Sequence, residues 1–510
     1  MDQSQTERGK FRPALKAVFS SENFSSKNRE ARIAAVGQMV LVGLVGGVFF
    51  AHGMNYVNHG LMTTFEASFP VAALRAIDGQ IPYRDFAFIE MPLALYLRGL
   101  MSFAVGSSII AGRYINLFVT LFALVGLVIV LRRRFGRWEP GLAAAFASVC
   151  SPHWVSAMVQ GTTAPLAMCF LVIAFGAAIL RGRDRVRTAL FALGMGAAII
   201  TSLQAIPLAA GLWIVALLGA SGMKQRLWLV AASLISIAAA LGNWFLIAGW
   251  RFEFFNWTFV GESELSRHVI LLLSETWKVS PGAILGCLSG LVASPLLLRR
   301  RFTLEQCLLL VCFLSMVVPL LSNNAYGKDI APVVPFVAAS GIVAVWRLDI
   351  GTRSPFRFAY WIFPLIGLLY PFPERIAEKP DLEIEETADA LREMAPAGPV
   401  LTPLPIVALT ASRDIYPGTD LGMLSVLSPK YQSYADELHM TTLDSLTDAI
   451  ERRQPAAIVL IRGSSRGNFN FGVPDMHPQP GAHIRGFNRA LHQNYFKVHQ
   501  TRTLDAYIAK

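Results

Sequence analysis

The sequence predicts a polytopic α-helical membrane protein with a small α/β domain at its C-terminal end. The first observation is composition, because 54% of the 510 residues are hydrophobic and only 15% are charged, against about 25% charged in a soluble domain. The second is pattern, since long apolar segments alternate with short arginine clusters. The third is a change after Tyr370 to an ordinary mixture of charged, proline and apolar residues. An ordinary soluble enzyme and a disordered chain are both excluded.

The net charge of +11 does not indicate nucleic-acid binding. The basic residues lie in short clusters between apolar segments, such as Arg132–Arg137 and Arg299–Arg301, rather than in one patch. This is the distribution expected of cytoplasmic loops in a membrane protein. The five cysteines lack the spacing of a metal or redox site and are expected to be small core residues.

The apolar segments predict about 11 transmembrane helices. They are Ile33–Gly53, Pro92–Ala111, Tyr114–Leu131, Gly141–Cys150 with its flanks, Gly161–Leu180, Ala189–Thr201, Ile206–Ala220, Leu227–Gly249, Ala283–Leu298, Gln306–Leu321, Ile330–Trp346 and Ala359–Tyr370. Placing every arginine cluster in the cytoplasm requires one net crossing over residues 92–131. Pro92–Ala111, which contains Arg98, two glycines and three serines, is therefore expected to lie at the outer interface.

The resulting topology divides the chain into three parts. Residues 1–32 form a basic cytoplasmic tail, residues 33–371 the membrane module, and residues 372–510 an outer, periplasmic α/β domain. The segment Ile33–Gly53 is too long for the apolar region of a signal peptide and is expected to be an anchor. The whole would be a multi-pass protein of a bacterial inner membrane.

The C-terminal domain is expected to alternate helices and strands. Leu382–Met394 and Thr442–Arg453 have helical patterns, whereas Ala456–Arg462 reads as a buried strand. Short strands are expected at Pro399–Thr402 and Ile406–Thr410, and a terminal hairpin is expected from Tyr495–Thr501 and Ala506–Ala509.

The first outer loop, residues 54–91, is polar and rich in charged residues. Glu66–Ile77 has helical spacing of apolar residues. Asp78-Gly79 then predicts a turn, and Pro82 favours an extended chain at Ile81. A helix, a turn and the interfacial helix from Pro92 would form a platform on the outer membrane surface.

Residues along most of the chain resemble bacterial GT-C glycosyltransferases, the group related to protein O-mannosyltransferases and the lipid A aminoarabinose transferase. The matching residues are Phe65-Glu66-Ala67, Ala72–Asp78, Gly79–Phe86 (GQIPYRDF), Met91-Pro92-Leu93, Leu131–Gly136, Gly398–Pro403, Ser412-Arg413 and Pro417–Gly422. The IPYRDF block is the most specific of these. The resemblance implies a GT-C fold and a transferase that uses a sugar carried on a polyprenyl phosphate.

Three positions depart from the family pattern. Phe65 replaces the first acid of an Asp-Glu pair, Gly161–Pro165 contains no acid, and Glu90-Met91 replaces a lysine that usually precedes a proline pair. Because a hard cation prefers several oxygen ligands, the loss of acids in two loops predicts that there is no metal site. No cofactor is expected.

The chemistry implied by the resemblance is attack of an acceptor hydroxyl on the anomeric carbon, with inversion. It requires a carboxylate base and cations for the departing phosphate. We expect Glu66 to be the base and Asp85 to orient Arg84 or bind the acceptor. Donor-phosphate candidates are Arg84, Lys328, Arg98 and Arg113. Candidates for the acceptor or the cavity wall are Glu90, Gln204 and His268.

Other interpretations remain open. Glu66 can simply cap its helix, Arg84 and Asp85 can form a structural ion pair, and Lys328 can belong to a solvated loop. A transporter or flippase of lipid-linked sugars is a second hypothesis, although the chain shows no inverted repeat. A non-catalytic glycan-binding relative is a third. The acceptor can be a lipopolysaccharide, an exopolysaccharide, a lipid-linked glycan or a protein.

Overall fold

The computed structural model describes residues 26–59, 64–160, 163–180, 184–220, 222–258, 331–349, 380–427, 429–462 and 481–510, with a few isolated positions between 277 and 365. The chain forms two compact units, Met1–Val48 and Phe49–Lys510. The account below concerns the second unit, except where helix α2 is named.

All the regular elements described in the membrane module are helices. Its elements are α2 (Ser26–His59), α3 (Thr64–Ile77), α4 (Pro92–Val105), α5 (Ile109–Phe135), α6 (Glu139–Val149), α7 (Pro152–Val159), α8 (Ala164–Ile179), α9 (Asp184–Thr201), η1 (Leu203–Ala205), α10 (Ile206–Leu218), α11 (Met223–Ala248), α12 (Trp250–Glu253), η2 (Phe254–Thr258) and α17 (Val334–Asp349). Proline at the first turn of α4, α6, α7, α8 and α10 favours helix initiation there.

Within the described residues, three helices are long and apolar enough to cross a membrane: Val36–Asn58, Ile109–Phe135 and Met223–Ala248. Helix α5 illustrates why its boundaries lie where they do. The Ser108 side chain accepts a hydrogen bond from the Ala111 amide, and Gly136 ends the helix in the left-handed conformation at φ 73°. Helix α5 therefore begins at Ile109, five residues before the start of the span predicted at Tyr114–Leu131.

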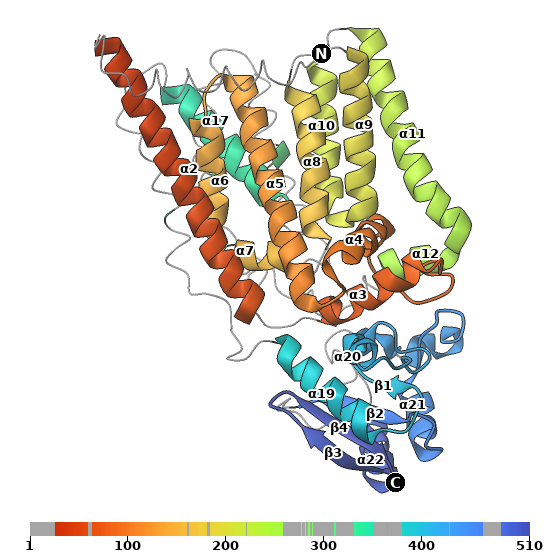
Figure 1. The fold of residues 1–510 in the computed structure, drawn as a ribbon. Coiled ribbons are helices and arrows are strands. Elements are labelled where there is room, and N and C mark those ends of the chain that lie inside the picture. Colours follow the sequence, from red (N-terminus) through yellow and green to blue (C-terminus); the bar gives the residue numbers. More distant parts are fainter. Residues whose placement is uncertain are drawn as a thin grey trace, which may run out of the picture. The chain divides into compact units, whose positions relative to one another are not determined.

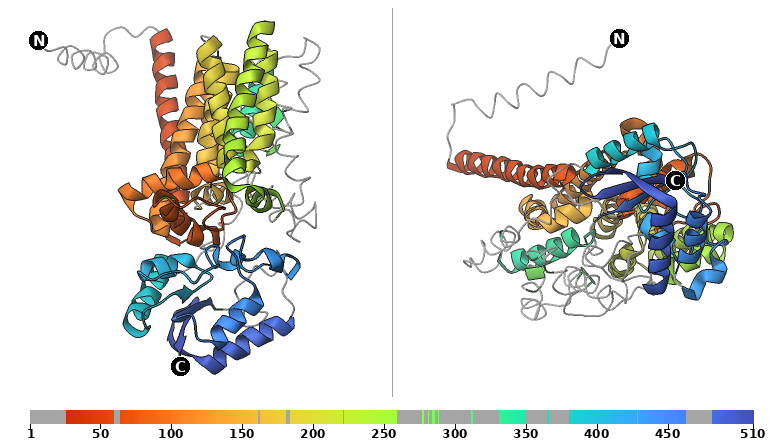
Figure 2. Two further views of the ribbon diagram at one scale, coloured as in Figure 1. Left: turned by 90° about the vertical axis from the view of Figure 1, so that its right-hand side faces the viewer. Right: turned by 90° about the horizontal axis from the view of Figure 1, so that it is seen from below.

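Helices α5, α8, α9, α10 and α11 pack side by side, as the two side views show (Figures 1 and 2). Helix α8 contacts α9, α5 and α10, and α11 contacts α9. Helix α6 packs between α5 and α17 and is buried along nearly its whole length. Helices α3 and α4 lie across the ends of the long helices in both views and contact α5 and α9.

The span predicted around Gly141–Cys150 with its flanks is not one straight helix in the structure. Helices α6 and α7 meet at a bend of 83°. Ser151 caps α7 by accepting a hydrogen bond from the Trp154 amide, and Pro152 occupies the first turn. A proline at this position removes a donor that α6 would need to continue. The predicted spans Ala283–Leu298, Gln306–Leu321 and Ala359–Tyr370 lie outside the described residues apart from isolated positions.

The C-terminal domain contains a four-stranded sheet with helices on both faces. Its elements are α19 (Pro380–Met394), β1 (Val400–Leu401), α20 (Pro405–Thr410), η7 (Gly422–Ser425), η8 (Pro429–Tyr434), α21 (Leu443–Glu451), β2 (Ala457–Ile461), α22 (Gly481–Asn494), β3 (Tyr495–Gln500) and β4 (Leu504–Ala509). The strand order is β1-β2-β4-β3. The β1–β2 pair is parallel and the other two pairs are antiparallel.

Alternate residues of β2 explain why the sheet is covered on both sides. Ala457 and Val459 pack with α19 and α20 in one apolar cluster. Ile458 and Leu460 pack with α21 and α22 in another. A strand that is apolar at every position is typical of a sheet buried on both faces.

Most element predictions for this domain are confirmed. The helices at 382–394 and 442–453, the strands at 399–402 and 456–462 and the terminal hairpin are all present. The predicted strand Ile406–Thr410 is wrong, because these residues form helix α20. Pro405 at its first turn presets a helical φ, and the short apolar run carried no periodicity that separated helix from strand.

Candidate functional site

The segment between α3 and α4 ends in a tight turn that presents two charged residues. Tyr83 has a φ of 67°, which is unusual for a residue other than glycine. Its amide donates to the Phe86 carbonyl at 2.9 Å, and the Asp85 amide donates to the Ile81 carbonyl at 2.8 Å. The chain predicted to be extended at Ile81 therefore turns directly after Pro82, at Tyr83–Asp85. Arg84 and Asp85 point outward at its tip and are exposed.

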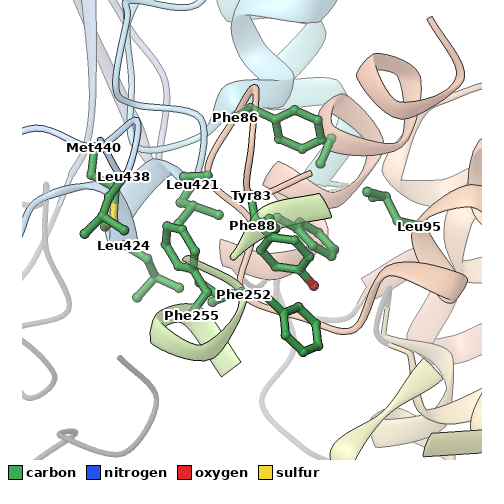
Figure 3. Close-up of a cluster of buried hydrophobic side chains, with 14 of the residues drawn as sticks. Tyr83, Phe86, Phe88, Leu95, Phe252, Phe255, Leu421, Leu424, Leu438 and Met440 are labelled. Carbon is green, nitrogen blue, oxygen red and sulfur yellow. The ribbon is translucent and has the colours of Figure 1, made fainter. Parts of the chain in front are cut away.

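Tyr83 is the buried anchor of this turn. The centroid of its ring lies 5.4 Å from that of Phe252. The ring centroids of Phe88, Phe255 and Trp244 lie 6.0, 6.2 and 6.2 Å away. Its hydroxyl donates to the Glu90 carbonyl. Figure 3 shows the ring of Tyr83 beside those of Phe88, Phe252 and Phe255, with Leu421 and Leu424 of the C-terminal domain in the same cluster. The left-handed backbone conformation is held by this packing, so the position of the charged tip is set by the aromatic cluster.

Arg84 and Asp85 form a bidentate ion pair. Arg84 Nε lies 2.9 Å from Asp85 Oδ1 and Nη2 lies 3.0 Å from Oδ2, while Oδ2 also accepts from the Ile81 amide at 2.7 Å. The hydrogen bonds from Arg84 hold the pKa of Asp85 below its ordinary value. The two side chains remain 49% and 32% exposed, so the pair is open to a ligand.

Residues far along the chain contact the same turn. His439 Nε2 lies 2.6 Å from the Arg84 carbonyl oxygen, and Arg251 Nη1 lies 3.5 Å from it. Arg75 at the end of α3 forms an ion pair with Asp420 at 2.7 Å. Burial raises the pKa of Asp420 above its ordinary value although Arg75 opposes the change. The α3–α4 segment is thus joined to the C-terminal domain by polar contacts.

Glu66 lies in a second polar group, which is buried. Both of its carboxylate oxygens accept hydrogen bonds from Arg113, Nε to Oε1 at 2.6 Å and Nη2 to Oε2 at 3.0 Å. The exposed fractions of the two side chains are 1% and 0%. Arg113 Nη1 also approaches the carbonyls of Tyr56 and Val57 at the end of α2, at 3.2 and 3.3 Å. Arg113 therefore ties α5 to the ends of α2 and α3.

Arg98 of α4 joins this buried group. Its Nη1 donates to the Gly112 carbonyl at 2.8 Å, and its charge interacts with Glu66. An added Cβ at Gly112 would lie 1.7 Å from Arg98 Nη2, so a side chain there would displace this guanidinium. Arg113 thus binds the Glu66 carboxylate directly, and Arg98 adds a second positive charge nearby.

The structure brings together some of the predicted site residues and not others. Glu66, Arg98 and Arg113 form the buried group, whereas Arg84 and Asp85 form the exposed pair. Gln204 is exposed in η1 and accepts a hydrogen bond from the Ser202 hydroxyl. Glu90 is half-buried just before α4. Lys328 and His268 lie outside the described residues.

Four residues of this region were missed by the sequence analysis: Tyr83, Arg251, Asp420 and His439. The IPYRDF block contains Tyr83, but its pattern does not reveal burial. Asp420 lies in the matching segment Pro417–Gly422 and so carried a weak signal. Nothing in the pattern around Arg251 or His439 distinguishes them, because their role depends on contacts between distant segments.

Among the described residues, no group of three or more His, Cys, Asp or Glu side chains is placed to hold a metal ion. The expected absence of a metal in the reaction stays a prediction.

The fold and these two polar groups define a helical membrane protein with a small α/β domain joined to the first loop of its membrane module. No protein-family model matches the sequence, and no curated protein matches it significantly. The fold is similar to that of ArnT from Cupriavidus metallidurans bound to undecaprenyl phosphate, with a TM-score of 0.62, 13% identity and coverage of 93% of this chain and 98% of that chain.

The apo state of the same ArnT aligns with a TM-score of 0.61 and 15% identity, again over 93% of this chain and 98% of that chain. An Archaeoglobus fulgidus oligosaccharyltransferase in complex with Zn and sulfate gives a TM-score of 0.48 at 13% identity, over 82% of this chain and 68% of that chain. At such identities, the likeness to ArnT establishes the fold. The GT-C fold that the IPYRDF block and its neighbours indicated is thereby confirmed.

Proposed function

We propose that this protein transfers a sugar from a polyprenyl-phosphate donor to an acceptor hydroxyl, with inversion and without a metal. The observation that carries the proposal is the fold likeness to ArnT over 93% of this chain, in a structure where ArnT binds undecaprenyl phosphate. Local resemblance at the IPYRDF block and the open Arg84–Asp85 pair support it. The acceptor is a glycan, a lipid or a protein.

We further propose the topology that the arginine clusters indicate. About 11 helices cross a bacterial inner membrane, the tail 1–32 is cytoplasmic, and residues 372–510 lie in the periplasm. Arg132, Arg133 and Arg134 in the last turn of α5 support this orientation, because they are far from the α3–α4 segment that contacts the start of the same helix. The active site is then on the outer face, with the donor arriving from the lipid.

In the proposed reaction, the acceptor oxygen forms a bond to the anomeric carbon as the bond from that carbon to the phosphate oxygen breaks. Polyprenyl phosphate leaves with the electron pair, and a carboxylate takes the hydroxyl proton. We assign the proton to Asp85, which is exposed, and the phosphate to Arg84 with Lys328. Glu90, Gln204 and His268 are assigned to the acceptor or the cavity wall.

The sequence made Glu66 the first candidate for the base, but the burial and contacts of its carboxylate do not favour that role. A base needs an oxygen that the acceptor hydroxyl can reach, whereas the Glu66 side chain is 1% exposed and both of its oxygens accept from Arg113. Arg84 binds both oxygens of Asp85 in the same way, but the Asp85 side chain is 32% exposed and so lies within reach of an acceptor. We therefore propose that Glu66 supplies the countercharge for Arg113 and Arg98. These two cations then support the site from within rather than contacting the donor phosphate.

The test is to incubate the purified protein in detergent with a panel of polyprenyl-phosphate sugars and candidate acceptors, and to measure release of polyprenyl phosphate. Release that persists with a chelator and is lost in Asp85→Asn supports the proposal and identifies the sugar. Release that stops with a chelator contradicts the metal-independent mechanism. No release from any donor contradicts transfer.

A second function, glycan binding without catalysis, is favoured by one specific observation. Both predicted catalytic carboxylates are bound by arginines, and Phe65 stands where the family usually has an acid. Binding of lipid-linked glycan with no turnover would support this alternative. Movement of the labelled lipid across vesicles would instead indicate a flippase.

A further inference from the structure

A turn in the C-terminal domain holds His439 in a strained conformation. His439 has a φ of 53°, in the left-handed region that residues other than glycine rarely occupy. The turn is closed by backbone hydrogen bonds from Leu438 to Tyr434 at 2.9 Å, from His439 to Asp436 at 3.2 Å and from Met440 to Ala435 at 2.9 Å. A non-glycine residue keeps such a conformation only where the surroundings enforce it.

The imidazole reaches the backbone of the charged turn in the membrane module. Its Nε2 lies 2.6 Å from the carbonyl oxygen of Arg84. A carbonyl oxygen only accepts, so Nε2 carries the proton and donates. Arg251 Nη1 approaches the same oxygen at 3.5 Å. Two donors from segments distant in sequence therefore converge on the peptide between Arg84 and Asp85.

The neighbours of His439 fix its position. Leu438 and Met440 are buried in the apolar cluster that also contains Tyr83, as Figure 3 shows. Gly418 packs against the turn so closely that an added Cβ would lie 3.1 Å from the Met440 carbonyl carbon and oxygen. Gly418 itself has a φ of 76°, so a side chain there is disfavoured for two reasons.

Both partners of the hydrogen bond between His439 and the Arg84 carbonyl are thus held in position without a ligand. The Arg84 end is held by Tyr83, and the His439 end by Leu438, Met440 and Gly418. Residues 83 and 439 both have positive φ values, which concentrates backbone strain on the two sides of one hydrogen bond. Strain of this kind is typical of functional sites.

We propose that His439 is a positioning residue that holds the Arg84–Asp85 pair through the Arg84 carbonyl, so that the C-terminal domain completes the site. The proposal rests on the proposed function, in which this pair contacts donor phosphate and acceptor. His439 acts on the backbone and touches neither substrate. Its loss should therefore loosen the pair while leaving the side chains of the pair present.

The experiment compares His439→Leu, which removes the donor, with His439→Gln, which keeps an N–H donor on a flexible side chain. Both variants bear the same strain at φ 53°, so their difference isolates the hydrogen bond. The control is His483→Leu, a histidine of α22 that contacts Asp444 and neither Arg84 nor its turn. The first measurement is hydrogen exchange at the amides of Tyr83 and Asp85, which are hydrogen-bonded within the turn.

Exchange at these amides should be about five- to tenfold faster in His439→Leu than in the wild type. It should be close to wild type in His439→Gln and in His483→Leu. In His439→Leu, KM for the lipid-linked donor should increase by the same factor as the exchange rate, with a smaller change in kcat. Wild-type exchange in His439→Leu would overturn the inference.

Gly418→Ala keeps the test informative if His439→Leu does not fold. This variant leaves the imidazole intact but displaces the turn, so it should also speed exchange at Tyr83 and Asp85. If neither variant changes exchange, positioning by the C-terminal domain is contradicted. Because exchange needs no turnover, a wild-type protein that transfers no sugar yet shows the predicted exchange pattern would count against the proposed function alone.

Discussion

Replacing Glu66 by glutamine tests whether this carboxylate is a structural countercharge or a catalytic base. The Arg113 side chain is 0% exposed and Glu66 is 1% exposed, so the charge on Arg113 has no access to water. Glutamine offers one acceptor oxygen, and its NH2 group would face a guanidinium N–H. Removing one partner of a buried ion pair costs about 3–5 kcal/mol, because the other charge stays buried and uncompensated.

Two features of the site change this cost in opposite directions. Glu66 is the carboxylate for two cations, since Arg98 also interacts with it. Against this, Arg113 keeps its contacts with the carbonyls of Tyr56 and Val57 and with the Tyr56 ring, 5.1 Å away. We therefore expect Glu66→Gln to lower the free energy of unfolding by about 4 kcal/mol.

The assay measures unfolding in mild detergent by tryptophan fluorescence for Glu66→Gln, Arg113→Met and the double variant. The double variant should be more stable than the sum of the single changes predicts, since it removes the unpaired charge of Arg113 and leaves only Arg98 without its carboxylate neighbour. Glu393→Gln, at an exposed position of α19, is the control and should have no effect. A Glu66→Gln protein that unfolds like the wild type but transfers no sugar would refute this reasoning and identify Glu66 as the base.

Three further predictions concern the exposed pair and its support. Burial raises the pKa of Asp420, so the free energy of unfolding of the wild type falls as the pH rises through that pKa. Asp420→Asn should remove this pH dependence, which a pH titration of unfolding measures. The same variant should change the free energy of unfolding at neutral pH by less than about 1 kcal/mol. Hydrogen bonds from Arg84 lower the pKa of Asp85, so the acidic limb due to this group in a plot of kcat/KM against pH should lie below the ordinary pKa of an aspartate, and a limb near neutral pH would point to another base. Asp85→Asn should reduce kcat by about 10²–10⁴-fold. Tyr83→Phe removes a buried donor to the Glu90 carbonyl and should cost about 1–2 kcal/mol in thermal unfolding, while an unchanged stability would show that this hydroxyl contributes nothing.

Periodicity and turn chemistry predicted the local elements that position the site. The helix at Glu66–Ile77, the Asp78-Gly79 turn and the helix from Pro92 are all present, because each depends on residues within one or two turns. The strand pair β3–β4 was predictable for the same reason. The bend between α6 and α7 and the helix α20 were not, since short apolar runs fit more than one structure.

The partners of the charged residues depended on tertiary structure. Sequence alone selected Glu66, Arg84, Asp85, Arg98 and Arg113 as the residues to watch, because charges beside apolar segments are few. It could not show that Arg113 binds Glu66, 47 positions away, or that His439 meets Arg84 across 355 positions. Such contacts form only when packing brings distant segments together. Local pattern therefore determined the kinds of element and the residues involved. The tertiary fold decided which charges are buried, paired or open to a substrate.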